Sequence, residues 1–183
     1  VSKVFVNQGI DILHPKYYDI SNIQSGKDNP EGWRFVEFPI YPTLVATAYF
    51  LNGAVDEELA RLIAITFSLG SVVFLYFIVK RYSSVAHALL SAFIFATLPF
   101  GIFYGRVILP EPLLVTSTLG MIYFTDSFID QVAGKIKSSI FKKFVSIIFA
   151  LFFSSIALLI KPFAVFLFLP IGYMFYRGFG FRL

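Results

Sequence analysis

The feature that most constrains this chain is the apolar run from Leu62 to Val79, which contains no charged residue. A helix needs about 20 mainly apolar residues to cross the hydrocarbon core of a bilayer. Comparable stretches follow, and 57% of all residues are hydrophobic against 14% charged, whereas soluble domains average about 45–50% apolar and 25% charged residues. The sequence therefore predicts an all-α membrane protein with about five transmembrane helices. We expect these spans at 61–80, 84–104, 111–128, 143–160 and 162–177.

The first third of the chain is more polar and predicts a separate region. We expect an extracytoplasmic loop at 1–60 and the transmembrane helices at 61–183. The apolar stretch from Phe38 to Asn52 is too short for an ordinary span, which favours a helix in the membrane interface, with a buried or re-entrant helix as the alternative. Because the chain opens on Val1 instead of Met and stops in an apolar stretch, we expect a fragment that lacks the first span.

The distribution of basic residues predicts the orientation. Segments 80–84, 129–143 and the tail after 176 fall on one side of a five-span protein. That side carries eight of the 15 Lys and Arg residues and two of the 11 acids, Asp130 and, at the end of the preceding span, Asp126. By the positive-inside rule it should face the cytoplasm, which leaves 1–61, the 104–112 turn and the 160–162 break outside. The eight are Lys80, Arg81, Lys135, Lys137, Lys142, Lys143, Arg177 and Arg182.

Several classes of function are excluded by what the sequence lacks. It has no cysteine, which removes disulfides, thiolate nucleophiles and cysteine-bound zinc. It has no glycine-rich nucleotide motif, no HExxH and no GxSxG. The net charge of +4 is explained by topology, so we expect no nucleic-acid partner. Heavy Phe and Lys usage suggests a prokaryotic inner or plasma membrane protein with membrane lipids as neighbours.

Three outward segments carry ionisable groups at the membrane boundary: Glu37 before the short apolar stretch, Arg106 and Glu111 in one turn, and Lys161 in the break. Charged groups near apolar helix are costly and commonly functional. Two carboxylates could hold a divalent metal cation, so Glu37 and Glu111 are the candidate metal ligands. Arg106 and Lys161 could bind a phosphate, with Arg61 as a polar wall of the site.

Each of these residues also has a simpler interpretation. Arg106 could pair with Glu111, Lys161 could extend to the interface, and Glu37 could be an exposed loop acid. Arg61 could instead pair with the acids at 56–58, which favour a helix start.

Two further side chains of the first loop, His14 and Trp33, are expected to have structural roles. His14 is expected to be a loop residue instead of a ligand. Trp33 is expected to be an interfacial anchor.

The order of these segments resembles the membrane-embedded GT-C glycosyltransferases. The closest branch contains the protein O-mannosyltransferases and the aminoarabinose transferases that modify lipid A (glycosyltransferase family 39/83-like, the dolichyl-phosphate-mannose-protein mannosyltransferase family). Five short motifs in order carry the resemblance, which covers nearly the whole chain. They are Val4-Phe5-Val6-Asn7-Gln8-Gly9, Glu37-Phe38-Pro39-Ile40-Tyr41-Pro42, Gly53 with Glu58 and Arg61-Leu62, Arg106-Val107-Ile108-Leu109-Pro110-Glu111, and Leu159-Ile160-Lys161-Pro162.

The resemblance implies a glycosyltransferase that moves a sugar from a polyprenyl-phosphate donor to a hydroxyl of a lipid, glycan or protein, by inverting displacement at the outer face. Arg106, Lys161 and a cation on Glu37 and Glu111 would stabilise the departing phosphate. Pro39 and Pro42 depart from the adjacent prolines of many members. The family's general-base aspartate would precede Val1, so the fragment should be inactive alone. A lipid-linked sugar transporter or flippase and an inactive assembly subunit are the alternatives.

Overall fold

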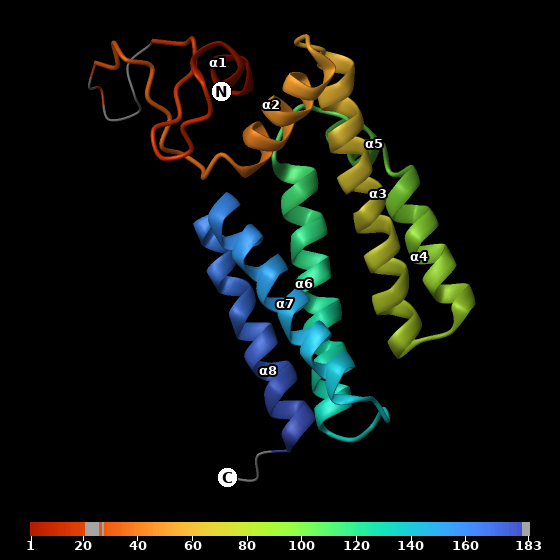
Figure 1. Ribbon diagram of the computed structural model, residues 1–183. Coiled ribbons are helices and arrows are strands. Elements are labelled where there is room, and N and C mark those ends of the chain that lie inside the picture. The colour runs from red at the N-terminus through yellow and green to blue at the C-terminus, as the bar shows by residue number, and fades with distance from the viewer. Residues whose placement is uncertain (21–25, 27, 181–183) are drawn as a thin grey trace.

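The computed structural model describes residues 1–20, 26 and 28–180. All the regular secondary-structure elements of these residues are helices (Figure 1). No strand occurs among the described residues, where the only bridge pairs Lys16 with Trp33. This confirms the predicted all-α class. The helices are α1 (Ser2–Gln8), α2 (Ile40–Asn52), α3 (Glu57–Tyr82), α4 (Val85–Thr97), α5 (Pro99–Gly105), α6 (Glu111–Val132), α7 (Ile140–Ile160), the 3₁₀ helix η1 (Pro162–Leu167) and α8 (Phe168–Phe179).

Four helical units of the described chain are long and apolar enough to cross a membrane, namely α3, α6, α7 and the continuous η1–α8 unit. The expected span at 84–104 is divided into α4 and α5, which meet at an angle of 64°. Leu98 adopts an extended conformation there because the ring of Pro99 disfavours helical geometry in the residue before it. Counting this bent pair, the structure has up to five spans, as the sequence predicts.

Helix α6 is the centre of the bundle and packs against α3, α7 and α8 (Figure 1). Half of its apolar window is buried, against 11% for α3. Small residues allow the close approach: a Cβ on Gly120 would lie 2.9 Å from the ring of Phe153 on α7. Membrane helices associate through such small residues because lipid leaves no hydrophobic driving force between them.

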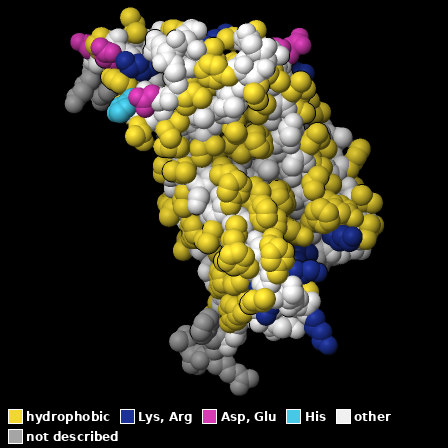
Figure 2. Space-filling view, in the orientation of Figure 1, with side chains coloured by type: hydrophobic (Ala, Val, Ile, Leu, Met, Phe, Trp, Pro, Cys, Tyr) yellow, Lys and Arg dark blue, Asp and Glu magenta, His cyan; other side chains and the backbone are white. Residues whose placement is uncertain are grey.

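The outer surface of the bundle is apolar over its middle and charged at its ends (Figure 2). Large side chains such as Leu69, Phe93, Phe144 and Leu151 are exposed on different helices. A soluble protein rarely exposes so much contiguous apolar area, so this surface suits lipid contact. The chain is a multi-pass integral membrane protein.

The two ends of the bundle carry different segments (Figure 1). One end holds α1, α2, the α5–α6 turn and the α7–η1 break, and we call it the Lys161 end. The opposite end holds the α3–α4 turn, the α6–α7 loop and the end of α8, and we call it the Arg81 end. The basic residues at 80–81 and 135–143 and Arg177 belong to the Arg81 end; Arg182 lies outside the described residues. The positive-inside rule predicts that this end is cytoplasmic.

Helix α2 closes the Lys161 end by burying one face against the bundle. The hydroxyl of Tyr41 donates a hydrogen bond of 3.0 Å to the carbonyl of Ala60 in α3. The opposite face, with Phe50 and Leu51, is exposed. The core at this end comprises Tyr41, Val45, Tyr49, Ala60, Ala64, Leu113 and Ile160.

The Tyr41→Phe substitution is expected to destabilise the fold by about 1 kcal/mol, because one buried hydrogen bond is lost. Burial, with a smaller effect of nearby Tyr49, raises the pKa of Tyr41 from 10.0 to about 12. The phenol therefore stabilises the fold fully below pH 10.0. As the pH rises toward 12, the unfolded state ionises first and wild type loses up to ~2–3 kcal/mol of stability, which is more than its advantage over Tyr41→Phe. Unfolding of both proteins across this range tests the prediction. A wild-type advantage that persists at the alkaline limit would contradict it.

Candidate functional site

The sequence candidates Glu37, Glu111 and Lys161 meet at one point of the Lys161 end. The ammonium of Lys161 contacts Glu37 Oε1 and lies 3.7 Å from Glu111 Oε1. The side chains of Lys161 and Glu37 are about one-fifth exposed, and that of Glu111 is 41% exposed. Three segments far apart in sequence thus supply one cluster, which we call the Lys161 cluster.

Local backbone structure fixes each member of the Lys161 cluster. The amide of Phe38 donates a hydrogen bond of 3.2 Å to the carbonyl of Leu159, so the loop with Glu37 is joined to the end of α7. Lys161 is extended between α7 and η1 because Pro162 disfavours helical geometry in the residue before it. Glu111 is the first residue of α6, where the helix dipole stabilises a negative charge.

One oxygen of the Lys161 cluster has no partner. Glu111 Oε2 is buried and accepts no hydrogen bond from the described part of the chain. An unsatisfied buried acceptor costs about 1–3 kcal/mol, so a ligand donor here would recover that energy. Glu111 also lines a cavity of about 440 Å³ between α3, α5 and α6, together with Ser68 and Tyr104. The remaining wall is mainly apolar and includes Phe95, Phe100 and Val115.

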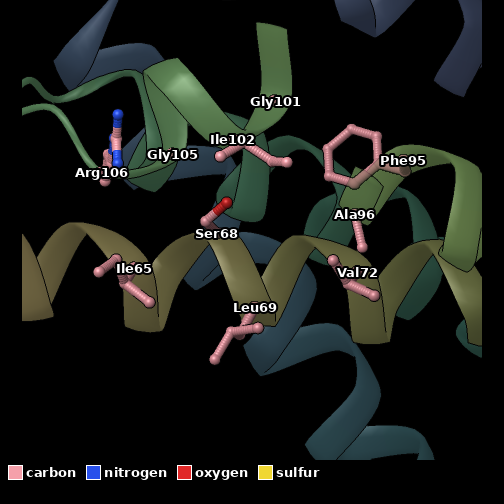
Figure 3. A pocket seen from close by; sticks show the side chains of 10 residues that line it. All are labelled: Ile65, Ser68, Leu69, Val72, Phe95, Ala96, Gly101, Ile102, Gly105 and Arg106. Carbon is pink, nitrogen blue, oxygen red and sulfur yellow. The ribbon is translucent and has the colours of Figure 1, made fainter. Parts of the chain in front are cut away.

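Arg106 lies at a second, neighbouring cavity of about 220 Å³ (Figure 3). Its walls are apolar side chains of α3 and α4, such as Ile65, Leu69 and Phe95. Arg106 forms no ion pair with any described residue, so the pairing with Glu111 considered from the sequence does not occur. The partner of Glu111 is Lys161. A guanidinium without an anion at the rim of an apolar cavity can bind a phosphate.

Arg61 is placed apart from these groups. It lines a shallow pocket with the acids Asp56, Glu57 and Glu58 at the start of α3. These are the acids with which the sequence analysis considered that Arg61 could pair. Asp56 caps this helix by accepting a 2.8 Å hydrogen bond from the amide of Glu58. No contact between Arg61 and the Lys161 cluster is found in the described residues.

The two cavities are separated by a close contact between α5 and α3. A Cβ on Gly105 would lie 2.5 Å from the hydroxyl oxygen of Ser68, and both residues line both cavities. We expect Gly105→Ala to push α5 away from α3 and to destabilise the fold by about 1–3 kcal/mol, the usual cost of overpacking. In the Gly105→Ala/Ser68→Ala double variant the nearest clash is removed, and part of the stability should return in thermal unfolding. An equal loss in both variants would exclude this steric explanation.

The Arg81 end contains an ion-pair network that the sequence analysis missed. Arg81 Nε donates to Asp126 at 2.6 Å, and its terminal nitrogen donates to Asp130 at 2.6 Å. The hydroxyl of Tyr82 donates to Asp126, also at 2.6 Å. The only signal in the sequence is the spacing of the two acids, which places them on one face of a helix. This network joins α3 to α6 far from the Lys161 cluster.

The structure is that of a polytopic helical protein with a charged cluster at its helix ends and a mainly apolar cavity beside it. The family model of the dolichyl-phosphate-mannose-protein mannosyltransferases matches residues 31–178, and the chain belongs to this family. It is therefore a membrane glycosyltransferase in general terms. No curated protein matches the chain, and no solved structure does.

Proposed function

We propose that this protein transfers a sugar from a polyprenyl-phosphate donor to an acceptor hydroxyl, at the membrane face on which the Lys161 cluster lies. The observation that carries the proposal is the meeting of Glu37, Glu111 and Lys161 from three segments beside two apolar cavities. A polyprenyl-linked sugar has the same combination of an anionic phosphate and an apolar chain. By the positive-inside rule, this face is the outer one.

In the proposed reaction, the acceptor oxygen bonds to the anomeric carbon while the bond from that carbon to the phosphate oxygen breaks, with inversion. The electron pair of the broken bond leaves with the polyprenyl phosphate. The Lys161 ammonium and the Arg106 guanidinium would stabilise this developing charge. Glu37 and Glu111 would position Lys161. The hydroxyl proton passes to a carboxylate base, which by the family resemblance is an aspartate other than these four side chains.

The sequence analysis predicts that Glu37 and Glu111 bind a divalent cation. The two carboxylates already face an ammonium, and the described residues contain no group of three or more acidic, histidine or cysteine side chains that could hold a metal ion. Calcium usually takes six to eight oxygen ligands, so the residues as arranged fit a lysine-centred site better. No step of the proposed reaction is derived through a metal.

A transporter for lipid-linked sugars and an inactive subunit are the rival functions. Transporters commonly place their binding groups near the bilayer midplane on broken helices, whereas the charges of the Lys161 cluster stand at helix ends. Glu111→Ala tests the choice. We expect it to abolish transfer in the intact gene product without lowering membrane yield, while the matched control Glu58→Ala, in the first turn of α3, keeps activity. Unchanged transfer by Glu111→Ala would reject the site.

A further inference from the structure

A second polar cavity, separate from the Lys161 cluster, lies in the first loop. It measures about 480 Å³, within the usual size range of ligand pockets. Helix α1 forms one wall, and the space beside Gly9 at its end is open, since no atom lies within 4 Å of where a Cβ would stand. The lining residues are Val4, Phe5, Gln8, Gly9, Asp11, His14, Lys16 and Trp33. We call it the His14 cavity.

Asp11 holds His14 in a fixed orientation. Asp11 Oδ1 accepts hydrogen bonds of 3.1 Å from the amides of Leu13 and His14. Asp11 Oδ2 lies 3.0 Å from Nδ1 of the His14 ring, and the carboxylate assigns the proton to that nitrogen. Nε2, which has no partner among the described residues, is then a hydrogen-bond acceptor.

The tryptophan on the other side of the His14 cavity is also held firmly. Its amide donates to Asn29 Oδ1 at 2.8 Å, and the Asn29 amide donates back to the Trp33 carbonyl at 3.1 Å. Lys16 Nζ lies 4.3 Å above the Trp33 ring, and the ring of His14 meets it edge-on at 5.7 Å. The wall is therefore formed before a ligand arrives, which reduces the entropy cost of binding.

In the His14 cavity the Lys16 ammonium is neutralised by Glu31 at 3.0 Å. The Asp11 carboxylate faces the neutral His14 ring and keeps its negative charge. An anion would meet the Asp11 carboxylate, and a purely apolar ligand would leave Gln8 and His14 unsatisfied. A neutral ligand with many hydroxyls can both donate to Nε2 and bond the Gln8 amide, because each hydroxyl is donor and acceptor.

Helix α1 and the first loop, which line the His14 cavity, lie at the end of the molecule that holds α2, which is the Lys161 end (Figure 1). Leu13, Pro15 and Phe35, from the same loop segments, line another cavity of about 360 Å³, which Glu37 also lines. We propose that the His14 cavity is a saccharide-binding subsite, in which His14 Nε2 and Gln8 bond sugar hydroxyls beside Trp33. Its role as the place of a sugar-bearing acceptor rests on the proposed transferase function; saccharide binding itself does not.

Trp33 is the single tryptophan of the 183-residue chain, so its fluorescence reports on this cavity. The protein in lipid nanodiscs would be titrated with methyl α-mannopyranoside and with maltose, and separately with glycerol and inorganic phosphate. We expect a saturable change with a saccharide, with Kd on the order of 1 mM, and none with glycerol or phosphate. A response to phosphate alone, or to no saccharide, would overturn the proposal.

Two variants link the fluorescence change to the named side chains. His14→Phe keeps a ring against Trp33 and removes both nitrogens, and we expect saccharide affinity to fall about ten-fold, or 1.4 kcal/mol. Gln8→Leu provides an independent check if the first variant fails to fold. Lys3→Gln, on α1 but outside the cavity, is the matched control and should bind normally. Equal affinity in all variants would overturn the proposal. Saccharide binding with unchanged transfer by Glu111→Ala would retain this subsite and reject only the transfer mechanism.

Discussion

Lys161→Gln is expected to lower sugar transfer by about 100-fold or more, the typical loss when one preorganised charge-stabilising group is removed from a site. The variant leaves Glu37 and Glu111 facing each other without a cation. Since both carboxylates are only partly buried, water would screen part of their repulsion. We expect a smaller loss of stability, about 1–3 kcal/mol.

A loss of transfer in Lys161→Gln could come from the lost positive charge or from a less stable fold, so the two effects must be measured separately. Transfer rates and thermal unfolding would be measured on the same preparations, with Lys161→Arg alongside. Arginine keeps the positive charge but not the shape of the ammonium, so it should fold normally and recover part of the activity. A Lys161→Gln protein that transfers sugar at the wild-type rate would show that the Lys161 cluster is only a structural contact between α7 and the loop.

Arg81→Met is expected to cause the largest loss of stability, about 3–5 kcal/mol, because it removes one partner of a partly buried ion-pair network. Asp126 and Asp130 would be left with the more exposed Lys135, which lies 3.3 Å from Asp130, as their remaining cation. The Arg81 side chain is 17% exposed, and that of Asp126 is 12% exposed. Little water is therefore available to solvate the stranded charges.

Two matched variants define the cause. Lys80→Met removes the neighbouring charge, which lies over the ring of Tyr76, and should unfold at nearly the wild-type temperature. The Arg81→Met/Asp126→Leu/Asp130→Leu triple variant replaces the whole network by apolar groups and should regain most of the stability. If the triple variant unfolds as early as Arg81→Met, packing of the arginine, instead of its charge, explains the loss.

The helical spans could be predicted from the sequence because apolar length alone determines them. The run from Leu62 to Val79 lies inside α3, and the tight connections make successive helices antiparallel. The division of 84–104 into two helices has a local cause in Pro99 that the sequence also displays. The angle between them was not predictable, since it depends on how α5 packs against α3.

The Lys161 cluster was predictable only in part. Topology brings Glu37, Glu111 and Lys161 to one end of the bundle, which the order of the apolar spans predicts. The ion-pair partner of Glu111 could not be predicted from the sequence. Glu111 is near Arg106 in sequence, but as the first residue of α6, directly after Pro110, it lies beside Lys161. The network at Arg81 joins residues 45 or more positions apart, and no local pattern reports such a contact.

The most direct test of the proposed sugar transfer is to measure the release of polyprenyl phosphate from its sugar-linked form. The intact gene product in nanodiscs would be incubated with polyprenyl-phosphate sugars and acceptor-containing membrane extract, and free polyprenyl phosphate would be measured. We predict that it accumulates together with glycosylated acceptor, and that Lys161→Gln abolishes both. If the folded protein released no polyprenyl phosphate from any donor, or moved the sugar lipid intact across the bilayer, the transferase account would be contradicted.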